Sequence, residues 1–176
     1  MPNIVFIAAS IDGFNARENG NVDWLNEIPN PNKSDFGLTK FFKRLDAIVL
    51  GRHTFDLVAN LPGWPYTKPV FVLSNSQKTL NKRFAGKAEL LHGNPADIIH
   101  AIHAKGFRNL YIDGGKTIQG FLAADLIDEL IITRIPILLG RGIPLFEVMN
   151  REMAFEHSST EVFDDLLVQS TYLRKR

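Results

Sequence analysis

The sequence predicts an α/β fold in three layers, with a mainly parallel central sheet and antiparallel strands near the C-terminus. Short apolar runs alternate with helix-like segments through most of the chain, which is typical of a parallel sheet covered by helices. The C-terminal part instead contains successive strand-like runs, which favours antiparallel pairing. The chain has 176 residues, 45% of them hydrophobic, so we expect one domain over residues 1–176.

Composition and charge exclude several classes of protein. Twenty basic and 19 acidic residues give a net charge of +1, so no bulk field favours nucleic acid or an acidic membrane surface. The chain has no cysteine, which excludes a disulfide framework, thiolate catalysis and a cysteine zinc site. The apolar run Ile4–Ile11 is too short for a signal peptide, and no segment has the length of a membrane span. We therefore expect a cytoplasmic protein without a nucleic-acid or membrane partner.

The N-terminal region predicts a buried strand, a long loop and a helix. Ile4–Ala9 is continuously apolar and ends in a turn at Asp12. Residues 15–34 are rich in Asn, Gly and Pro, and loops of this length in compact domains are usually functional or disordered. Ser34 or Asp35 can cap a helix that runs to about Arg44.

The middle of the chain predicts alternating strands and helices. The apolar runs Ala47–Leu50, Pro69–Leu73 and Ala88–Leu91 predict strands. A short helix is expected through Thr54–Leu57, and Pro95–His103 has the pattern of an amphipathic helix. This alternation indicates a parallel sheet.

A strand, a glycine turn and a helix start follow one another in the stretch from Leu110 to Leu122. The adjacent Gly114 and Gly115 permit a sharp turn, and the helix start offers unpaired N–H groups, so the stretch is either an anion site or a tight turn. The pattern G-x-x-x-x-G-K-[ST] would need glycine at Leu110, and G-x-G-x-x-G is absent. A phosphate bound here would belong to another fold.

The C-terminal region predicts three strands. Leu126–Leu138 is rich in isoleucine and indicates a long strand interrupted at Pro136. Met153–His157 and Leu166–Leu173 are strand-like, and Asp164-Asp165 predicts a hairpin between them.

Three predicted strands end in turns that suit phosphate. The turns begin at Gly51, Ser74 and Gly114, and the carboxyl ends of parallel strands form the ligand-binding edge of an open α/β sheet. One extended, multiply charged ligand such as a dinucleotide would reach all three turns. The guanidinium of Arg52 beside the Ser74 hydroxyl suits a phosphate monoester and favours NADP over NAD. The alternatives are that Arg52 is a surface residue and that Ser74-Asn75 is a simple turn.

These residues carry a resemblance to the dihydrofolate reductase-like fold. It rests on residues 50–55 (LGRHTF), residues 72–75 (VLSN), and Gly114-Gly115-Lys116 with Phe121 downstream. Within that fold the chain most resembles the reductase domain of riboflavin biosynthesis, the C-terminal family of bacterial bifunctional deaminase-reductases. The closer likeness rests on residues 9–13 (ASIDG), 113–115 (DGG), 126–130 (LIDEL) and 135–142 (IPILLGRG).

The resemblance implies a reductase that takes hydride from NADPH. The backbone at Ala9 would hold the nicotinamide carboxamide, and the Gly51–Thr54 turn would bind the adenosine phosphates. Leu73, Ser74 and Asn75 would lie on the adenine side, and the turn from Gly114 to Thr117 would hold the pyrophosphate. The implied cofactor residues are Gly51, Arg52, His53, Thr54, Leu73, Ser74, Asn75, Gly114, Gly115, Lys116 and Thr117, together with Ala9.

The implied substrate and catalytic residues leave alternatives open. Dihydrofolate reductases bind the pterin with a carboxylate at the first helix, after a loop tryptophan. Asp35 and Trp24 are the candidates, although another alignment places Leu38 there and Asp35 also suits a helix cap. At the family level Asp12 and Asp113 are candidate polar contacts, and each also suits a turn. Asp35 and Asp113 are thus the catalytic candidates.

Other polar residues carry weaker signals. Thr133 lies on the strand after the glycine pair's helix and is a candidate substrate contact, although threonine is common in strands. His53 is interpreted as a helix-start residue, and no set of His, Asp and Glu forms a ligand pattern, so we expect no metal. Without cysteine the chain lacks the zinc deaminase half of the bifunctional enzyme, which leaves a stand-alone reductase domain. The apolar C-terminal strands and the pairing of related reductase domains predict a homodimer.

Three functions remain open at this point. The first is an NADPH-dependent reductase resembling 5-amino-6-(5-phosphoribosylamino)uracil reductase of riboflavin biosynthesis. The second is a dihydrofolate reductase, and the third is a non-catalytic protein that binds NADPH.

Overall fold

The computed structural model describes residues 1–176. It divides into two compact units, each built from two separate stretches of chain. The first unit contains Met1–Ile4 and Arg44–Ile127, and the second contains Val5–Lys43 and Asp128–Arg176. The single-domain expectation stays a prediction.

The first unit is built on parallel strands. Parallel pairs join β4 to β5, β3 to β4, β3 to β6 and, at its first residues, β1 to β6. The apolar runs of β3, β4, β6 and the start of β1 are buried because both faces of a parallel sheet are covered, whereas the edge strand β5 is only partly buried. The strands are β3 (Ala47–Gly51), β4 (Val70–Leu73), β5 (Ala88–Leu91), β6 (Leu110–Asp113) and the start of β1 (Asn3–Ser10).

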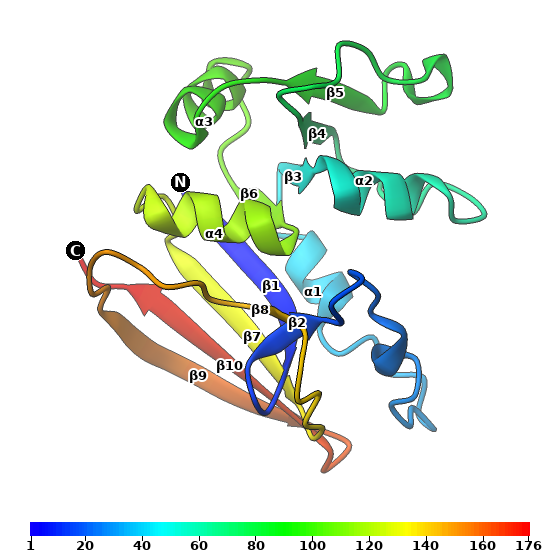
Figure 1. Ribbon diagram of the computed structural model, residues 1–176, viewed down its shortest axis with the longest axis vertical. Helices are drawn as coiled ribbons and strands as arrows, with labels where there is room; N and C mark the ends of the chain where they lie inside the picture. Colours follow the sequence, from blue (N-terminus) through cyan, green and yellow to red (C-terminus); the bar gives the residue numbers. More distant parts are fainter. The chain divides into compact units, whose positions relative to one another are not determined.

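The helices of the first unit follow its strands, as the sequence predicts. α2 comes directly after β3, α3 follows β5, and α4 follows β6 after a single glycine, and Figure 1 shows α2 beside the end of β3. The bounds are α2 (Arg52–Ala59), η2 (Lys82–Phe84), α3 (Pro95–Ala104) and α4 (Gly115–Ala123). The turns at the carboxyl ends of these strands are therefore helix starts.

The second unit carries the antiparallel strands. β10 (Leu167–Arg174) pairs antiparallel with both β7 (Glu129–Ile135) and β9 (Phe155–Phe163), and Figure 1 shows β9 at the outer side of this group. The expected hairpin is confirmed, since Asp164 and Asp165 both have a positive φ of 54° between β9 and β10. β7 ends at the residue before Pro136, because proline cannot donate to the ladder.

Several expected elements have different bounds in the structure; the helix expected at Thr54–Leu57 is α2, and the strand expected at Leu126–Leu138 is the shorter β7. The helix expected from Asp35 is α1 (Leu38–Phe42), because Phe36 and Gly37 have φ angles of 50° and 83° that no helix contains. The strand expected at Met153–His157 is the longer β9. The loop after β1 contains β2 (Phe14–Ala16), which pairs with β8 (Ile143–Pro144), and the single turn η1 (Asp23–Leu25).

Each unit has its own core. In the first unit the buried side chains come from the strands and from the inner faces of α3 and α4, such as Ile102 and Phe121. In the second unit Trp24 packs with Ile135 and Leu167, and the rings of Phe6 and Phe41 are stacked at 4.6 Å. Burying such apolar surface supplies most of the stability of a domain.

The predicted fold class is confirmed. The strand order is β5-β4-β3-β6-β1-β7-β10-β9, with parallel pairs from β5 to β1 and antiparallel pairs at the C-terminal strands. No helix combines the length and the apolar character that crossing a membrane requires.

Candidate functional site

The carboxyl ends of three strands lie at one level in the first unit. In the strand register Gly51 lies opposite Leu73, and Leu50 lies opposite Asp113. The turns that follow β3, β4 and β6 therefore lie next to one another, as the sequence predicts. The predicted cofactor residues in these turns are Gly51, Arg52, His53, Thr54, Leu73, Ser74, Asn75, Gly114, Gly115, Lys116 and Thr117.

Two of the turns lead into helices that start without a side-chain cap. Gly51 precedes α2 and Gly114 precedes α4, and neither helix start has a side-chain hydrogen bond to its first amides. The two starts are in contact, because a Cβ at Gly51 would overlap Thr117 Oγ1 and a Cβ at Gly114 would lie 2.5 Å from Thr54 Oγ1. Two helix N-termini thus lie side by side, and their amides and dipoles favour an anion such as phosphate.

A cavity of about 180 Å³ adjoins the start of α4. Its apolar lining comes from β4, β5, α3 and α4, and its only charged lining residue is Lys116. A small apolar pocket with a few polar groups suits the ring of a base. The apolar lining residues are Leu73, Leu91, Ile98 and Phe121, and the polar ones include Ser74, Asn75 and Thr117.

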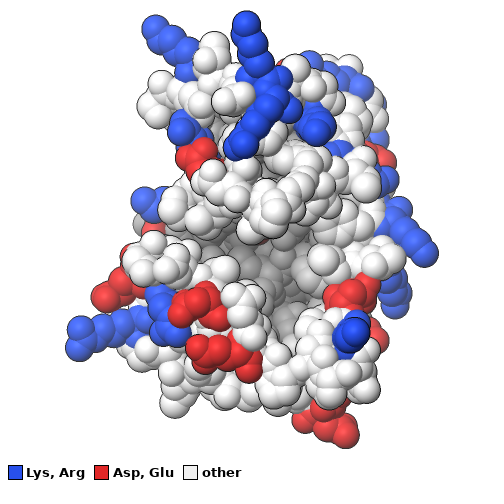
Figure 2. All heavy atoms as spheres, turned by 90° about the vertical axis from the view of Figure 1, so that its right-hand side faces the viewer, with Lys and Arg blue, Asp and Glu red and all other residues white.

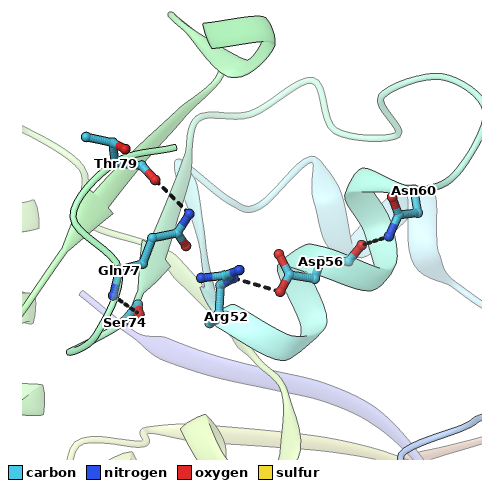
Figure 3. A network of polar contacts seen from close by, with 6 residues as sticks. All are labelled: Arg52, Asp56, Asn60, Ser74, Gln77 and Thr79. Atoms are coloured by element: carbon cyan, nitrogen blue, oxygen red, sulfur yellow. Dashed lines mark hydrogen bonds and ion pairs between the residues drawn. The ribbon is translucent and has the colours of Figure 1, made fainter. Parts of the chain in front are cut away.

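Arg52 lies at the first position of α2, beside the turn after β4 (Figure 3). Its Nε donates a hydrogen bond of 2.7 Å to Asp56 Oδ2, one helical turn later. Ser74 Oγ accepts a hydrogen bond of 3.1 Å from Gln77 N. The predicted phosphate-binding pair therefore has a carboxylate neighbour that the sequence analysis did not consider, although the spacing of four residues on one helix is its signal.

A basic segment at residues 57–88 surrounds the turn after β4. It contains five Lys or Arg residues and no Asp or Glu. Lys78, Lys82, Arg83 and Lys87 are exposed, and Figure 2 shows blue side chains gathered at the top of the view. Such a local positive field attracts an anionic ligand even when the net charge of the chain is near zero.

Asp113 ends β6 directly before the glycine turn. Its Oδ1 accepts a hydrogen bond of 2.8 Å from Gly114 N, and its carboxylate also accepts one from the Tyr111 hydroxyl. Burial raises the pKa of Asp113 to about 6, against the lowering by these two hydrogen bonds. Burial and the charge of Asp113 raise the pKa of Tyr66 above its ordinary value. The first unit thus holds a carboxyl group that titrates near neutral pH.

Tyr111 and Tyr66 are absent from the sequence-based candidates. Tyr111 precedes Asp113 by two residues on β6, so both side chains lie on the same face of the strand. The two-residue period of side chains along a strand is the sequence signal that could have identified Tyr111 as a neighbour of Asp113. Tyr66 comes from the loop before β4, and nothing in the sequence connects it to Asp113.

In the second unit the Asp12 carboxylate joins two loops. Oδ1 accepts from Ser10 Oγ at 2.6 Å and from Leu139 N at 3.1 Å, and Oδ2 accepts from Gly140 N at 2.7 Å. The Ser10 hydroxyl is the main cause that lowers the pKa of Asp12. This geometry agrees with a turn role, and the substrate role stays a prediction. Ala9, on β1, is fully buried.

The Asp35 carboxylate lies at the start of α1, two residues before the cap position Gly37, and binds backbone amides there. Its Oδ1 accepts a hydrogen bond of 3.0 Å from Gly37 N and its Oδ2 accepts one of 2.9 Å from Thr39 N. The Thr39 side chain is the first cause that lowers the pKa of this exposed carboxyl. A general acid needs a pKa near the working pH, so the capping alternative fits better, and the catalytic role stays a prediction.

Thr133 and Trp24 are both buried in the second unit. Gln169 Nε2 donates to Thr133 Oγ1 at 2.9 Å and to the Phe36 carbonyl at 3.2 Å. Sequence reasoning missed Gln169, although a polar residue in phase with buried Leu167 signals a buried partner. Trp24 is 1% exposed, and its Nε1 has no hydrogen-bond partner.

The structure contains no group of three or more His, Cys, Asp or Glu side chains that is placed to hold a metal ion. His53 occupies the second position of α2.

Proteins of known sequence or structure resemble this chain over its full length. Uncharacterized protein YwjB of Bacillus subtilis is 34% identical over 174 residues, which is 97% of each chain. The crystal structure of a candidate riboflavin biosynthesis protein from Shewanella sp. PV-4 is 50% identical, covers 100% of both chains and has a TM-score of 0.95.

The likeness also extends to a dihydrofolate reductase. The enzyme from Enterococcus faecalis, in complex with NADP(H), has a TM-score of 0.68 and 19% identity, and the match covers 99% of this chain and 97% of that chain. This likeness shows the dihydrofolate reductase-like fold. The RibD C-terminal domain family matches residues 3–168, which confirms the family that the motifs indicate. The chain belongs to the RibD C-terminal domain family.

Proposed function

We propose that this protein is an NADPH-dependent reductase resembling 5-amino-6-(5-phosphoribosylamino)uracil reductase. The observation that carries the proposal is the contact between two uncapped helix starts at the carboxyl ends of β3 and β6. Membership of the RibD C-terminal domain family supports a reductase-type function in the riboflavin pathway.

The residues of the first unit fit the parts of NADPH. The amides at the starts of α2 and α4 would hold the pyrophosphate, because helix N-termini bind anions. The cavity beside Leu73 and Phe121 would hold the adenine. Arg52 and Ser74 would bind the 2′-phosphate through charge-assisted and hydroxyl hydrogen bonds.

When bound, NADPH supplies a hydride, and the reduction also needs a proton. Asp113 is our candidate for holding that proton, because its pKa of about 6 keeps part of the carboxyl protonated near neutral pH. The Tyr111 hydroxyl and Gly114 N fix the orientation of the carboxyl.

Turnover separates this proposal from the two alternatives. NADPH oxidation is measured with a ribosylaminopyrimidine and with dihydrofolate. Oxidation with the ribosylaminopyrimidine supports the proposal. Oxidation of dihydrofolate that is lost in Asp35→Asn supports a dihydrofolate reductase, and NADPH binding without turnover on either substrate supports a non-catalytic protein.

The role of Arg52 has its own test. Arg52→Ala is expected to weaken NADPH binding by about 1–3 kcal/mol, because a charge-assisted contact is lost, and to weaken NADH binding much less. Calorimetric titration with both nucleotides measures the difference. Equal weakening of both would show that Arg52 does not bind the 2′-phosphate.

We also propose that the protein is a cytoplasmic homodimer that pairs through its C-terminal strands. Val162 of β9 and Val168 of β10 are 55% and 41% exposed, and β9 lies at the end of the strand order. Light scattering measures the mass in solution, and a monomer at high concentration would contradict the proposal.

A further inference from the structure

The Arg52 guanidinium is already engaged by a carboxylate of its own helix. Arg52 Nε and Asp56 Oδ2 lie 2.7 Å apart, and the two side chains are 42% and 46% exposed. Arginine presents five N–H donors in a planar fork. The ion pair therefore engages Nε of Arg52 and leaves N–H donors on the two terminal nitrogens of the guanidinium.

Figure 3 shows Ser74 and Gln77, on the turn after β4, on the side of Arg52 that faces away from Asp56. Arg52 and Ser74 follow residues that lie opposite each other in the β3–β4 register. Gln77 Nε2 donates to the Thr79 carbonyl at 2.6 Å, whereas Gln77 Oε1 is buried without a hydrogen-bond partner. A buried acceptor without a donor indicates an incomplete network.

We propose that Asp56 is a specificity-determining residue of the nucleotide site: its carboxylate competes with the 2′-phosphate of NADPH for Arg52 and accepts from the 2′-hydroxyl of NADH. Asp56 therefore narrows the preference of the site for NADPH over NADH. This inference rests on the proposed cofactor site in the first unit.

The charges around Arg52 explain why Asp56 would weaken the binding of NADPH and strengthen the binding of NADH. A phosphate monoester carries close to two negative charges near neutral pH. When it binds the fork of Arg52, it comes close to the Asp56 carboxylate, and the repulsion opposes binding. A ribose hydroxyl brings no charge, and a carboxylate can accept its hydrogen bond, as the acidic residue does in Rossmann-type NAD sites. Asp56 thus weakens NADPH and strengthens NADH.

The test compares Asp56→Asn with a matched control. Asparagine keeps the size of the side chain and removes the charge. Glu89→Gln is the control, because Glu89 Oε1 pairs with Lys105 Nζ at 3.0 Å in the same unit and the two side chains are 43% and 48% exposed, close to those of Arg52 and Asp56. Dissociation constants for NADPH and NADH are measured by calorimetry at low ionic strength, where exposed charges act most strongly.

Asp56→Asn is expected to tighten NADPH about fivefold, since exposed charge interactions reach that size, and to weaken NADH, because a neutral amide accepts the 2′-hydroxyl less strongly than a carboxylate. Glu89→Gln is expected to leave both constants unchanged. An unchanged NADPH-to-NADH ratio in Asp56→Asn, with wild-type binding intact, overturns the inference and leaves the reductase proposal standing. A wild-type protein that binds neither nucleotide overturns both.

Discussion

The starts of α2 and α4 differ from the start of α3, although all three helices follow parallel strands of the first unit. At α3 the Asn94 side chain accepts from Asp97 N at 3.0 Å, and proline occupies the first turn. At α2 and α4 a glycine stands in the cap position and no side chain caps the first amides. The chain therefore caps one helix internally and leaves two helix starts available.

This difference indicates that an anionic ligand is expected at the starts of α2 and α4 and not at the start of α3. Glycine in the cap position costs a helix only about a few tenths of a kcal/mol relative to a side-chain cap, and it leaves the first amides of α2 and α4 without a side-chain partner. Asp35 in the second unit shows the opposite choice, since both of its oxygens accept from backbone amides near α1. An anion at α2 and α4 would satisfy the amides that the sequence leaves uncapped.

The first prediction concerns a substitution that breaks the contact between the starts of α2 and α4, and its expected effect is the largest. Gly114 has φ +98°, and an added Cβ would lie 2.5 Å from Thr54 Oγ1. Gly114→Ala is expected to lower the free energy of unfolding by about 2–4 kcal/mol through backbone strain and overpacking. Chemical denaturation measures the loss.

Gly120→Ala in the same helix is the control for this variant. A Cβ at Gly120 meets nothing within 4 Å, so this change is expected to stabilise the protein by about 0.5–1 kcal/mol. Equal effects of the two substitutions would contradict the close approach at Gly114.

The second prediction concerns the carboxyl beside the α4 start. Burial raises the pKa of Asp113 from 3.8 to about 6, so the folded state binds its proton more tightly than the unfolded state. Well below pH 3.8 both states are protonated and Asp113 has no effect; between pH 3.8 and about 6 the unfolded state ionises first, so the fold loses up to about 3 kcal/mol of stability as pH rises through this window. The stability of Asp113→Asn relative to wild type should therefore rise over this range. A difference that is constant with pH would refute the shifted titration.

The third prediction tests whether Gly51 and Thr117 interlock. Gly51 has an ordinary φ of −66°, so backbone strain plays no part and the effect of Gly51→Ala comes mainly from its overlap with Thr117 Oγ1. Gly51→Ala is expected to cost about 1–3 kcal/mol, and Thr117→Ala in the same chain to recover most of it, because the overlapping oxygen is removed. Additive losses in a double-mutant cycle would show that the residues do not interact.

The smallest expected effect is at the capped helix. Asn94→Ala removes the cap of α3 and is expected to destabilise the protein by about 1 kcal/mol. NADPH affinity should remain unchanged, because the α3 cap is satisfied within the chain. Thermal unfolding measures the stability of Asn94→Ala, and titration of the same sample with NADPH measures its affinity. A large loss of affinity would contradict the claim that ligand binds the starts of α2 and α4 and not the start of α3.

The sequence predicts the first unit well because its signals are local. The apolar runs of β3 to β6 and the turns at Gly51, Ser74 and Gly114 are each contained in a few consecutive residues. Their meeting at one edge follows from the geometry of parallel strands. Asp56 was missed because the expected helix, Thr54–Leu57, left Arg52 outside it, whereas α2 begins at Arg52 and brings the two side chains one turn apart.

The second unit was predicted less well because its contacts are distant in sequence. The Asp12 carboxylate accepts from Leu139 and Gly140, and Gln169 donates to Phe36 and Thr133. α1 begins later than expected because Phe36 has a positive φ, which is uncommon for a bulky side chain and has no sequence signal. Whether Asp12, Asp35, Trp24 and Thr133 contact substrate stays a prediction.

The most direct test is a titration of the labelled protein with NADPH, followed by the backbone amide resonances. The account predicts that the amides of Arg52–Thr54 and Gly115–Thr117 shift most, with saturation at the same concentration, whereas the Asp97 amide, which is bonded to the Asn94 side chain, shifts less. The amide shifts on adding NADPH would then be larger at the starts of α2 and α4 than at the capped start of α3. Shifts confined to other parts of the chain, or equal shifts at all three helix starts, would contradict the assignment of α2 and α4 as the phosphate site.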